Sequence, residues 1–244
     1  MIQKKQTWIA AFLCCIALAL GAQNPYGTRW KNELLWTGGS TLGMGGSLLL
    51  HRHNQPFTPA QVATLDIGNV PRFERFATRQ YSLSAKKASD VLLFSAVASP
   101  ALLFLDKNIR QDAPTAVLLV GESMFLNLAL TSLCKEIARR PRPYNYNPAV
   151  PLADKLTKDA RQSFFSGHTS MSAAATFSAA RIWLDYHPDS EWKPVVWAAA
   201  AAIPATVGFL RVKAGRHYLT DVLTGFAVGS ACGLLVPHFH RKRN

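Results

Sequence analysis

Three short stretches, far apart in the chain, carry the side chains that phosphate chemistry uses. They are residues 135–143 (KEIARRPRP), 165–168 (FSGH) and 211–221 (RVKAGRHYLTD). Together they supply several cations, a Ser-Gly turn at an expected helix start, and two histidines, one of which is followed by a carboxylate four residues later. Such a set can bind a phosphate, attack it and protonate the group that leaves.

The expected anion site combines positive side chains with backbone N–H groups. A phosphoryl group needs cations around its oxygens, and Lys135, Arg142 and Arg211 can provide them. The arginines can make bidentate contacts. Ser166 and Gly167 come directly before an apolar stretch that we expect to be helical, where N–H groups and the helix dipole favour an anion. We predict that these five residues bind phosphate.

The two histidines have separate expected roles. His217 and Asp221 are four residues apart, so on one helix face the carboxylate can accept a hydrogen bond from one ring nitrogen. That bond fixes the tautomer and leaves the other nitrogen free to attack phosphorus. His168 lies among the cations, where it can protonate a leaving alkoxide. The predicted catalytic residues are therefore His217, His168 and Asp221, and this chemistry requires no metal or other cofactor.

Each motif also has an ordinary alternative interpretation when it is taken alone. The basic run at 135–142 is typical of a cluster that binds lipid headgroups, and a His-x-x-x-Asp pair is commonly structural. His168, His217 and Asp221 could instead bind zinc, although three converging cations would oppose a divalent ion. About nine specified residues at fixed spacing would rarely coincide by chance, so the combination favours the phosphate site.

Composition limits the class of protein. The length, 244 residues, suits a single domain with a sizeable core. A net charge of +13 at pH 7 indicates an anionic partner. Nucleic acid is disfavoured, because 49% of the residues are hydrophobic and no nucleic-acid module is recognisable. A phospholipid surface or a phosphorylated substrate remains as the anionic partner. The apolar residues lie in long blocks, which favours a membrane protein or a very apolar helical one, and the oligomeric state is left open.

The first 22 residues have the layout of a secretory signal peptide. Two lysines precede the apolar run Trp8–Leu20, and small residues follow at positions 21 and 22. An uncleaved anchor helix is the alternative, although the run is short for a membrane span. After cleavage only Cys134 and Cys232 would remain, and we expect both to be free, buried thiols.

The elements that must position the motifs are apolar blocks of helix length. A weak, glycine-rich block at Leu34–Leu50 lies in an N-terminal extension, residues 23–84, and a basic tail follows at 239–244. Five firmer blocks between them, within residues 85–238, are Val91–Leu105, Pro114–Cys134, Thr169–Leu184, Pro194–Leu210 and Leu219–Pro237. This pattern predicts an all-α, membrane-embedded bundle. If consecutive helices run antiparallel, all three motifs fall at one end of it.

The motifs resemble the signature of the type-2 phosphatidic-acid phosphatase and vanadium haloperoxidase superfamily, which is Lys-x6-Arg-Pro, Pro-Ser-Gly-His and Ser-Arg-x5-His-x3-Asp. The matching residues are Lys135, Arg142, Pro143, Ser166, Gly167, His168, Arg211, His217 and Asp221. Two positions depart from the pattern: Phe165 replaces proline and Leu210 replaces serine. Neither departure removes a catalytic group, although the missing serine hydroxyl is expected to loosen one phosphate contact. The similarity covers about residues 85–238.

The resemblance implies a six-helix bundle and a phosphohistidine intermediate on His217, formed without metal and hydrolysed by water. In membrane members it also implies an active site that faces away from the cytoplasm. We therefore expect a phosphatase that hydrolyses a lipid phosphate monoester or pyrophosphate on the extracytoplasmic side. The alternatives are a soluble secreted or periplasmic acid phosphatase, a vanadate-dependent haloperoxidase, and a non-catalytic membrane protein that binds anionic lipid. The sequence does not choose among lipid substrates.

Overall fold

The computed structural model describes residues 24–27 and 33–242. Over these ranges the chain is helical and forms no β-strand, apart from an isolated bridge between Tyr26 and Arg241. The predicted all-α class is confirmed. The signal peptide expected at residues 1–22 lies outside the described residues, as do the last two residues of the predicted basic tail.

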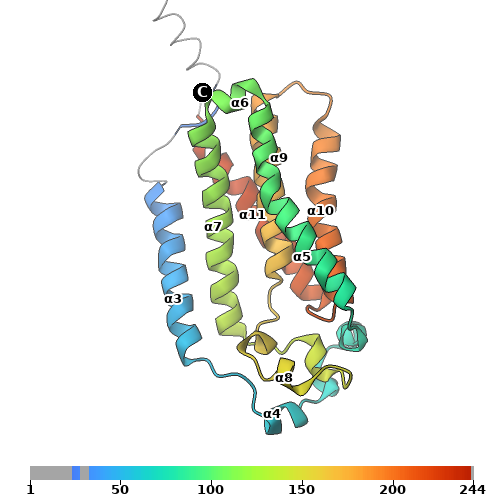
Figure 1. Cartoon of the computed structure of the whole chain (residues 1–244). Helices are drawn as coiled ribbons and strands as arrows, with labels where there is room; N and C mark the ends of the chain where they lie inside the picture. Colours follow the sequence, from blue (N-terminus) through green and yellow to red (C-terminus); the bar gives the residue numbers. More distant parts are fainter. Residues whose placement is uncertain (1–23, 28–32, 243–244) are drawn as a thin grey trace, which may run out of the picture.

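Long helices lie side by side as a bundle, and loops with short helices close one end of it (Figure 1). The long helices are α3 (Gly39–His53), α5 (Leu83–Ala98), α7 (Ala113–Ala138), α9 (Gly167–Tyr186), α10 (Lys193–Lys213) and α11 (Leu219–His240). Every predicted apolar block, including the weak glycine-rich one, overlaps one of them. The expected count of six therefore fits the longer helices, but shorter ones accompany them in the described ranges.

The shorter elements mostly connect the long helices. The short α-helices are α4 (Pro59–Ala63), α6 (Lys107–Gln111) and α8 (Leu152–Lys155). A π-helical turn, η1 (Leu34–Gly38), precedes α3. The 3-10 turns are η2 (Ile67–Asn69), η3 (Arg72–Arg79), η4 (Ser99–Leu105), η5 (Pro143–Tyr146) and η6 (Lys158–Arg161). Proline at the second residue of η4 coincides with the change from α-helical to 3-10 geometry after α5.

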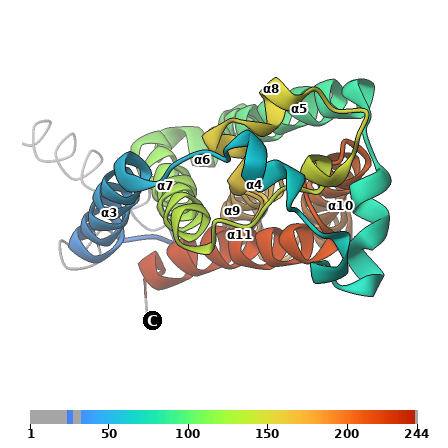
Figure 2. The same ribbon diagram turned by 90° about the horizontal axis from the view of Figure 1, so that it is seen from below.

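Helix α9 occupies the centre of the bundle and packs against α5, α7, α10 and α11 (Figure 2). Its buried face consists largely of alanine, serine and threonine. Small side chains allow helices to approach closely, which is the usual means of helix packing in membranes.

Helix α11 comes closest to α9 along a stripe of three glycines spaced four residues apart. A Cβ atom added at Gly225, Gly229 or Gly233 would lie only 2.1–2.8 Å from a backbone carbonyl oxygen of α9 or of Ser166, which precedes it. Only glycine permits this approach. The contact brings the two helix starts together, and the Ser166 N–H donates to the Asp221 carbonyl oxygen at 2.9 Å.

The turn between α10 and α11 depends on Gly215. Its φ of +69° lies in the left-handed region, and a Cβ atom there would lie 2.1 Å from the Gln80 carbonyl oxygen. The Gly215 carbonyl also accepts from the Tyr144 N–H at 3.0 Å. This turn therefore joins the last motif to the loop that follows α7.

Four segments of the described chain are long and apolar enough to cross a membrane: Leu83–Leu105, Ala113–Tyr146, Lys193–Lys213 and Leu219–His240. Large apolar side chains on these segments point outward, with Phe94 71%, Leu105 78% and Phe209 65% exposed. Exposed apolar surface of this extent fits lipid rather than water. The predicted membrane protein is therefore confirmed at this level. Cys134 and Cys232 are free thiols, of which Cys232 is buried and Cys134 half-buried.

Candidate active site

The predicted motifs meet at one end of the bundle. Lys135 lies in the last turn of α7, Ser166 caps the start of α9, and Arg211 lies in the last turn of α10. His217 follows in the turn before α11. In Figure 1 this is the end closed by the loops around α4 and α8. The antiparallel arrangement expected from the apolar blocks therefore brings the motifs together.

His217 is buried, and both of its ring nitrogens have defined neighbours. Nδ1 lies 2.8 Å from the Ser163 carbonyl oxygen, which can only accept, so Nδ1 carries the proton and donates. Nε2 therefore carries the lone pair, which accepts a hydrogen bond from Arg142 Nη1 at 3.1 Å. Burial lowers the pKa of His217 well below its usual value, and the charges of Arg142, Arg211 and Lys135 lower it further. The imidazole is neutral and can act as a nucleophile.

Asp221 does not accept the hydrogen bond from His217 that the sequence suggested. The expectation that both lie on one helix face is wrong, because α11 begins at Leu219. The nearest Asp221 carboxylate oxygen lies 3.6 Å from His217 Nδ1, and the hydrogen bond goes to Ser163 instead. Asp221 Oδ2 accepts from the Ser163 hydroxyl at 2.5 Å and from the Tyr218 N–H at 2.8 Å. Asp221 thus holds the segments on either side of the imidazole.

His168 forms a second, more open centre on α9. Its Nε2 lies 2.8 Å from Asp90 Oδ1, and 28% of its side chain is exposed. Burial and the nearby Arg211 lower the pKa of His168 to about 4, against the opposing effect of Asp90. A bound phosphate dianion would favour the protonated form, because an opposite charge nearby raises the pKa of a histidine. The site can therefore supply a proton when the anion is present.

The three predicted cations lie at this end of the bundle, and each makes different contacts. Arg142 is fixed by its Asp159 and Arg216 contacts, including Nη2 to Asp159 Oδ1 at 2.6 Å. Arg211 contacts Asp90 at 3.2 Å, and its buried Nε has no hydrogen-bond partner among the described residues. Lys135 Nζ lies 3.5 Å from the position of a Cβ on Gly167. Lys135 Nζ therefore lies close to the start of α9, and Arg211 keeps one donor without a partner among the described residues.

The start of α9 adds backbone donors to these cations. Ser166 is fully buried as the N-cap, and its hydroxyl lies 2.9 Å from the Thr169 hydroxyl. The helix begins at Gly167, so its first N–H groups have no partner within the helix. N–H groups at a helix start favour an anion. Ser166, Gly167 and His168 therefore lie where the sequence predicted an anion site.

Sequence reasoning missed several residues that hold the site. Arg140 bridges two carboxylates, with contacts of 2.6 Å to both Glu74 and Asp221. Its position within the first motif offered a signal, but the motif pattern does not specify it. Asp159 has no such signal; the positive charges of Arg142 and Lys135 outweigh its burial and lower its pKa to about 2. Asp90 likewise lies far from every motif in sequence.

Comparison with known proteins gives the family. Residues 116–244, more than half of the chain, match the PAP2 superfamily. This chain belongs to that superfamily, which agrees with the resemblance carried by its motifs.

Two similar proteins have named activities. A phosphatidylglycerophosphatase B from Bacillus subtilis (strain 168) is 35% identical over 133 residues, which is 54% of this chain and 59% of that protein. A probable diacylglycerol pyrophosphate phosphatase 1 from Schizosaccharomyces pombe is 31% identical over 128 residues, 43% of this chain and 46% of that protein. The chain thus spans about half the length of these relatives.

One solved structure is also similar. It is a transmembrane PAP2 type phosphatidylglycerolphosphate phosphatase from Bacillus subtilis, at 23% identity and a TM-score of 0.49. The likeness covers 84% of this chain and 96% of that one.

Proposed function

We propose that this protein hydrolyses a lipid phosphate monoester or pyrophosphate through a phosphohistidine intermediate on His217. The observation that carries the proposal is the tautomer of this buried, neutral imidazole. Its Nδ1–H is committed to the Ser163 carbonyl, and its Nε2 lone pair faces the cationic pocket. A nucleophile with a fixed tautomer beside an anion site is what phosphoryl transfer to nitrogen requires.

The reaction then takes two steps. In the first, His217 Nε2 attacks phosphorus, the N–P bond forms and the P–O bond to the leaving group breaks. The leaving oxygen takes its proton from His168, which the Asp90 carboxylate holds in place at 2.8 Å. In the second step, a water molecule attacks phosphorus and returns a proton to His168 while the N–P bond breaks. Lys135, Arg142 and Arg211 neutralise the phosphoryl oxygens in both steps.

Three features support a lipid rather than a water-soluble substrate. The apolar helices indicate a membrane environment, and both named relatives carry the name of a lipid phosphatase. The third is a groove of about 660 Å³ between α10 and α11, lined mainly by apolar side chains that include Phe209, Leu223 and Phe226; its lining also includes Val212, next to Arg211 in the chain. Acyl chains could lie in this groove while the headgroup reaches His217.

We also propose that the site faces away from the cytoplasm. In support, Arg241 and Lys242 lie at the opposite end of the bundle, and basic residues beside a span favour the cytoplasmic side. Ala149→Cys and Asp189→Cys, each made in protein whose natural cysteines have been replaced, would place a single thiol at one end of the bundle or the other. An impermeant thiol reagent should label Ala149→Cys, but not Asp189→Cys, in intact cells. The reverse pattern would place the site inside, and equal labelling would favour a soluble enzyme.

The activity itself is tested by phosphate release from purified protein. Phosphatidic acid, phosphatidylglycerol phosphate and diacylglycerol pyrophosphate would be compared with glycerol phosphate in the same detergent. At least one lipid should exceed glycerol phosphate in kcat/KM by about 100-fold, since the lipid also gains apolar binding energy. Release from none of the lipids, or equal release by His217→Ala protein, would overturn the proposal.

A further inference from the structure

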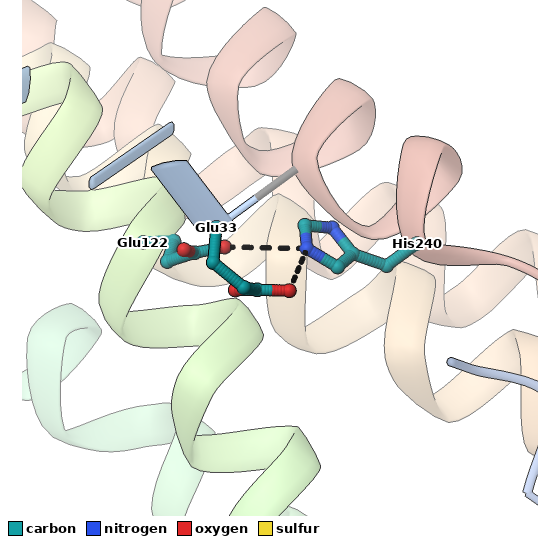
Figure 3. Close-up of side chains that lie close together, drawn as sticks. All are labelled: Glu33, Glu122 and His240. Atoms are coloured by element: carbon teal, nitrogen blue, oxygen red, sulfur yellow. Dashed lines mark hydrogen bonds and ion pairs between the residues drawn. The ribbon is translucent and has the colours of Figure 1, made fainter. Parts of the chain in front are cut away.

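At the end of the bundle opposite the active site, three ligand-type side chains from distant parts of the chain converge (Figure 3). Glu33 precedes the turn that leads into α3, Glu122 lies within α7, and His240 is the last residue of α11. One ligand atom from each lies within 4.8 Å of the other two. Both carboxylates point at the same ring nitrogen of His240.

The Nδ1 atom of His240 is committed to the backbone. It lies 2.7 Å from the Val236 carbonyl oxygen and donates to it, so Nε2 is the ring nitrogen left for a ligand. Nε2 lies 3.1 Å from Glu33 Oε1 and 3.5 Å from Glu122 Oε2. Metal-binding histidines commonly donate the other ring N–H to a carbonyl in this way. Three ligand-type atoms therefore face one another.

The cluster is largely buried and includes a ligand atom without a partner. Glu122 is 5% and His240 1% exposed, whereas 27% of the Glu33 side chain is exposed. Within the described ranges, Glu122 Oε2 has no hydrogen-bond partner, and no lysine or arginine there forms an ion pair with either carboxylate. A buried carboxylate oxygen without a partner is costly, and a divalent cation between the three side chains would satisfy it.

The spacing of the donor atoms suits a small transition-metal ion. Ligands about 2.0–2.1 Å from a tetrahedral zinc lie about 3.3 Å from one another, close to the 3.1 and 3.5 Å separations at His240. Thr37 donates to the other oxygen of Glu122 at 2.8 Å and so orients that ligand. Magnesium and calcium prefer more oxygen ligands and no imidazole.

We propose that Glu33, Glu122 and His240 form a structural site for a zinc-class divalent ion. The ion would tie the segment before α3 to α7 and α11, at the carbonyl end of α11 where the helix dipole favours a cation. The Glu33 side chain, 27% exposed, leaves a route for entry and room for a water as the fourth ligand. The site lies apart from His217 and takes no part in catalysis.

Zinc binding by the full chain tests the proposal. The protein would carry an affinity tag without histidine, be stripped with chelator in detergent and then be titrated with ZnCl₂ against a chromophoric chelator. One zinc should bind per chain, and saturation should raise the unfolding temperature by about 5–10 °C. Manganese should bind more weakly and magnesium more weakly still.

Variants locate the ion. Glu122→Gln, which keeps the shape and the Thr37 contact, and His240→Ala should each weaken zinc binding by about 100-fold or more, and Thr37→Val by about tenfold. His238→Ala, an exposed neighbour on α11, and His217→Ala, at the other end, should bind zinc normally. Phosphate release by Glu122→Gln would verify its fold. Absence of zinc binding by the natural chain, or unchanged binding by Glu122→Gln and His240→Ala, would mean that the three residues form only a hydrogen-bonded clasp.

Discussion

One buried histidine lies at each end of the bundle. The two make the same hydrogen bond from Nδ1, but the charges near their Nε2 atoms are opposite in sign. His217 and His240 both donate from Nδ1 to a backbone carbonyl, at 2.8 and 2.7 Å, and both turn Nε2 toward charged groups. At His217 those groups are arginines and a lysine, whereas at His240 they are two carboxylates. A lone pair beside cations is suited to attack an incoming anion, and one beside carboxylates is suited to bind a cation.

The comparison shows that the histidine alone does not define a site. The carbonyl contact decides which nitrogen is free, and the charges that face this nitrogen decide which ligand it meets. These charges come from different helices, so they are set by the packing of the bundle. The following predictions test whether the two ends behave as opposite and independent centres.

Among the residues around the nucleophile His217, His168 should give the largest effect, and that effect should depend on the leaving group. His168→Ala should lower kcat/KM on a lipid phosphate by about 10²–10⁴-fold, because the alkoxide then leaves without a proton. An activated aryl phosphate, whose leaving group needs no proton, should lose far less. Arg142→Ala is the matched control, since it removes charge from the phosphoryl oxygens and should weaken both substrates alike. Equal losses for His168→Ala on both substrates would mean that His168 binds phosphate and does not donate the proton.

Asp90 should control the pH dependence of that proton donation. Its carboxylate favours the protonated form of His168, and burial together with Arg211 lowers that pKa to about 4. Asp90→Asn should lower the pKa further, so that less His168 is protonated at neutral pH. The pH optimum on lipid phosphate should move about one unit to lower pH. Ser89→Ala, which removes the 3.3 Å contact to Arg211 and a hydrogen bond to the Lys86 carbonyl but keeps Asp90, should leave the optimum in place; a shift in both variants would attribute the effect to Arg211.

Chelation should have the smallest effect on the rate of phosphate release, because it should act only on the cluster around His240. EDTA should leave the initial rate of phosphate release unchanged, because side chains supply the positive charge at His217. The same treatment should lower the unfolding temperature through the His240 cluster. Vanadate should inhibit by resembling the transition state at His217. Loss of activity in EDTA that zinc restores at once, without any change in unfolding temperature, would place the metal in the active site.

The sequence predicted the helices and their convergence well, because both follow from apolar blocks and short connections. It also placed Lys135, Arg142 and Arg211 at the correct end of the bundle. It misjudged the partner of His217, since spacing of four residues suggests a helical pair but the helix begins two residues later. At the helix start the Tyr218 N–H donates to the Asp221 carboxylate at 2.8 Å, a contact that the usual Ser/Thr-x-x-Glu capping pattern does not predict.

Other contacts left no local trace in the sequence. Asp90 reaches His168 across 78 residues, and Glu33 reaches His240 across 207. Neither carboxylate belongs to a motif, and no spacing rule links residues so far apart. Such partners follow only from the packing of α5, α7, α9 and α11, which the composition of each helix suggests but does not fix.

The covalent intermediate is the central claim, and trapping it is the most direct test. Purified protein would be mixed with a ³²P-labelled lipid phosphate, quenched in alkali within the first turnovers and digested for mass spectrometry. A phosphoramidate, stable in alkali and labile in acid, should appear on the peptide that contains His217 and be absent from the His217→Ala variant. Label on a different residue, or full turnover with no covalent species in the natural protein, would contradict the mechanism.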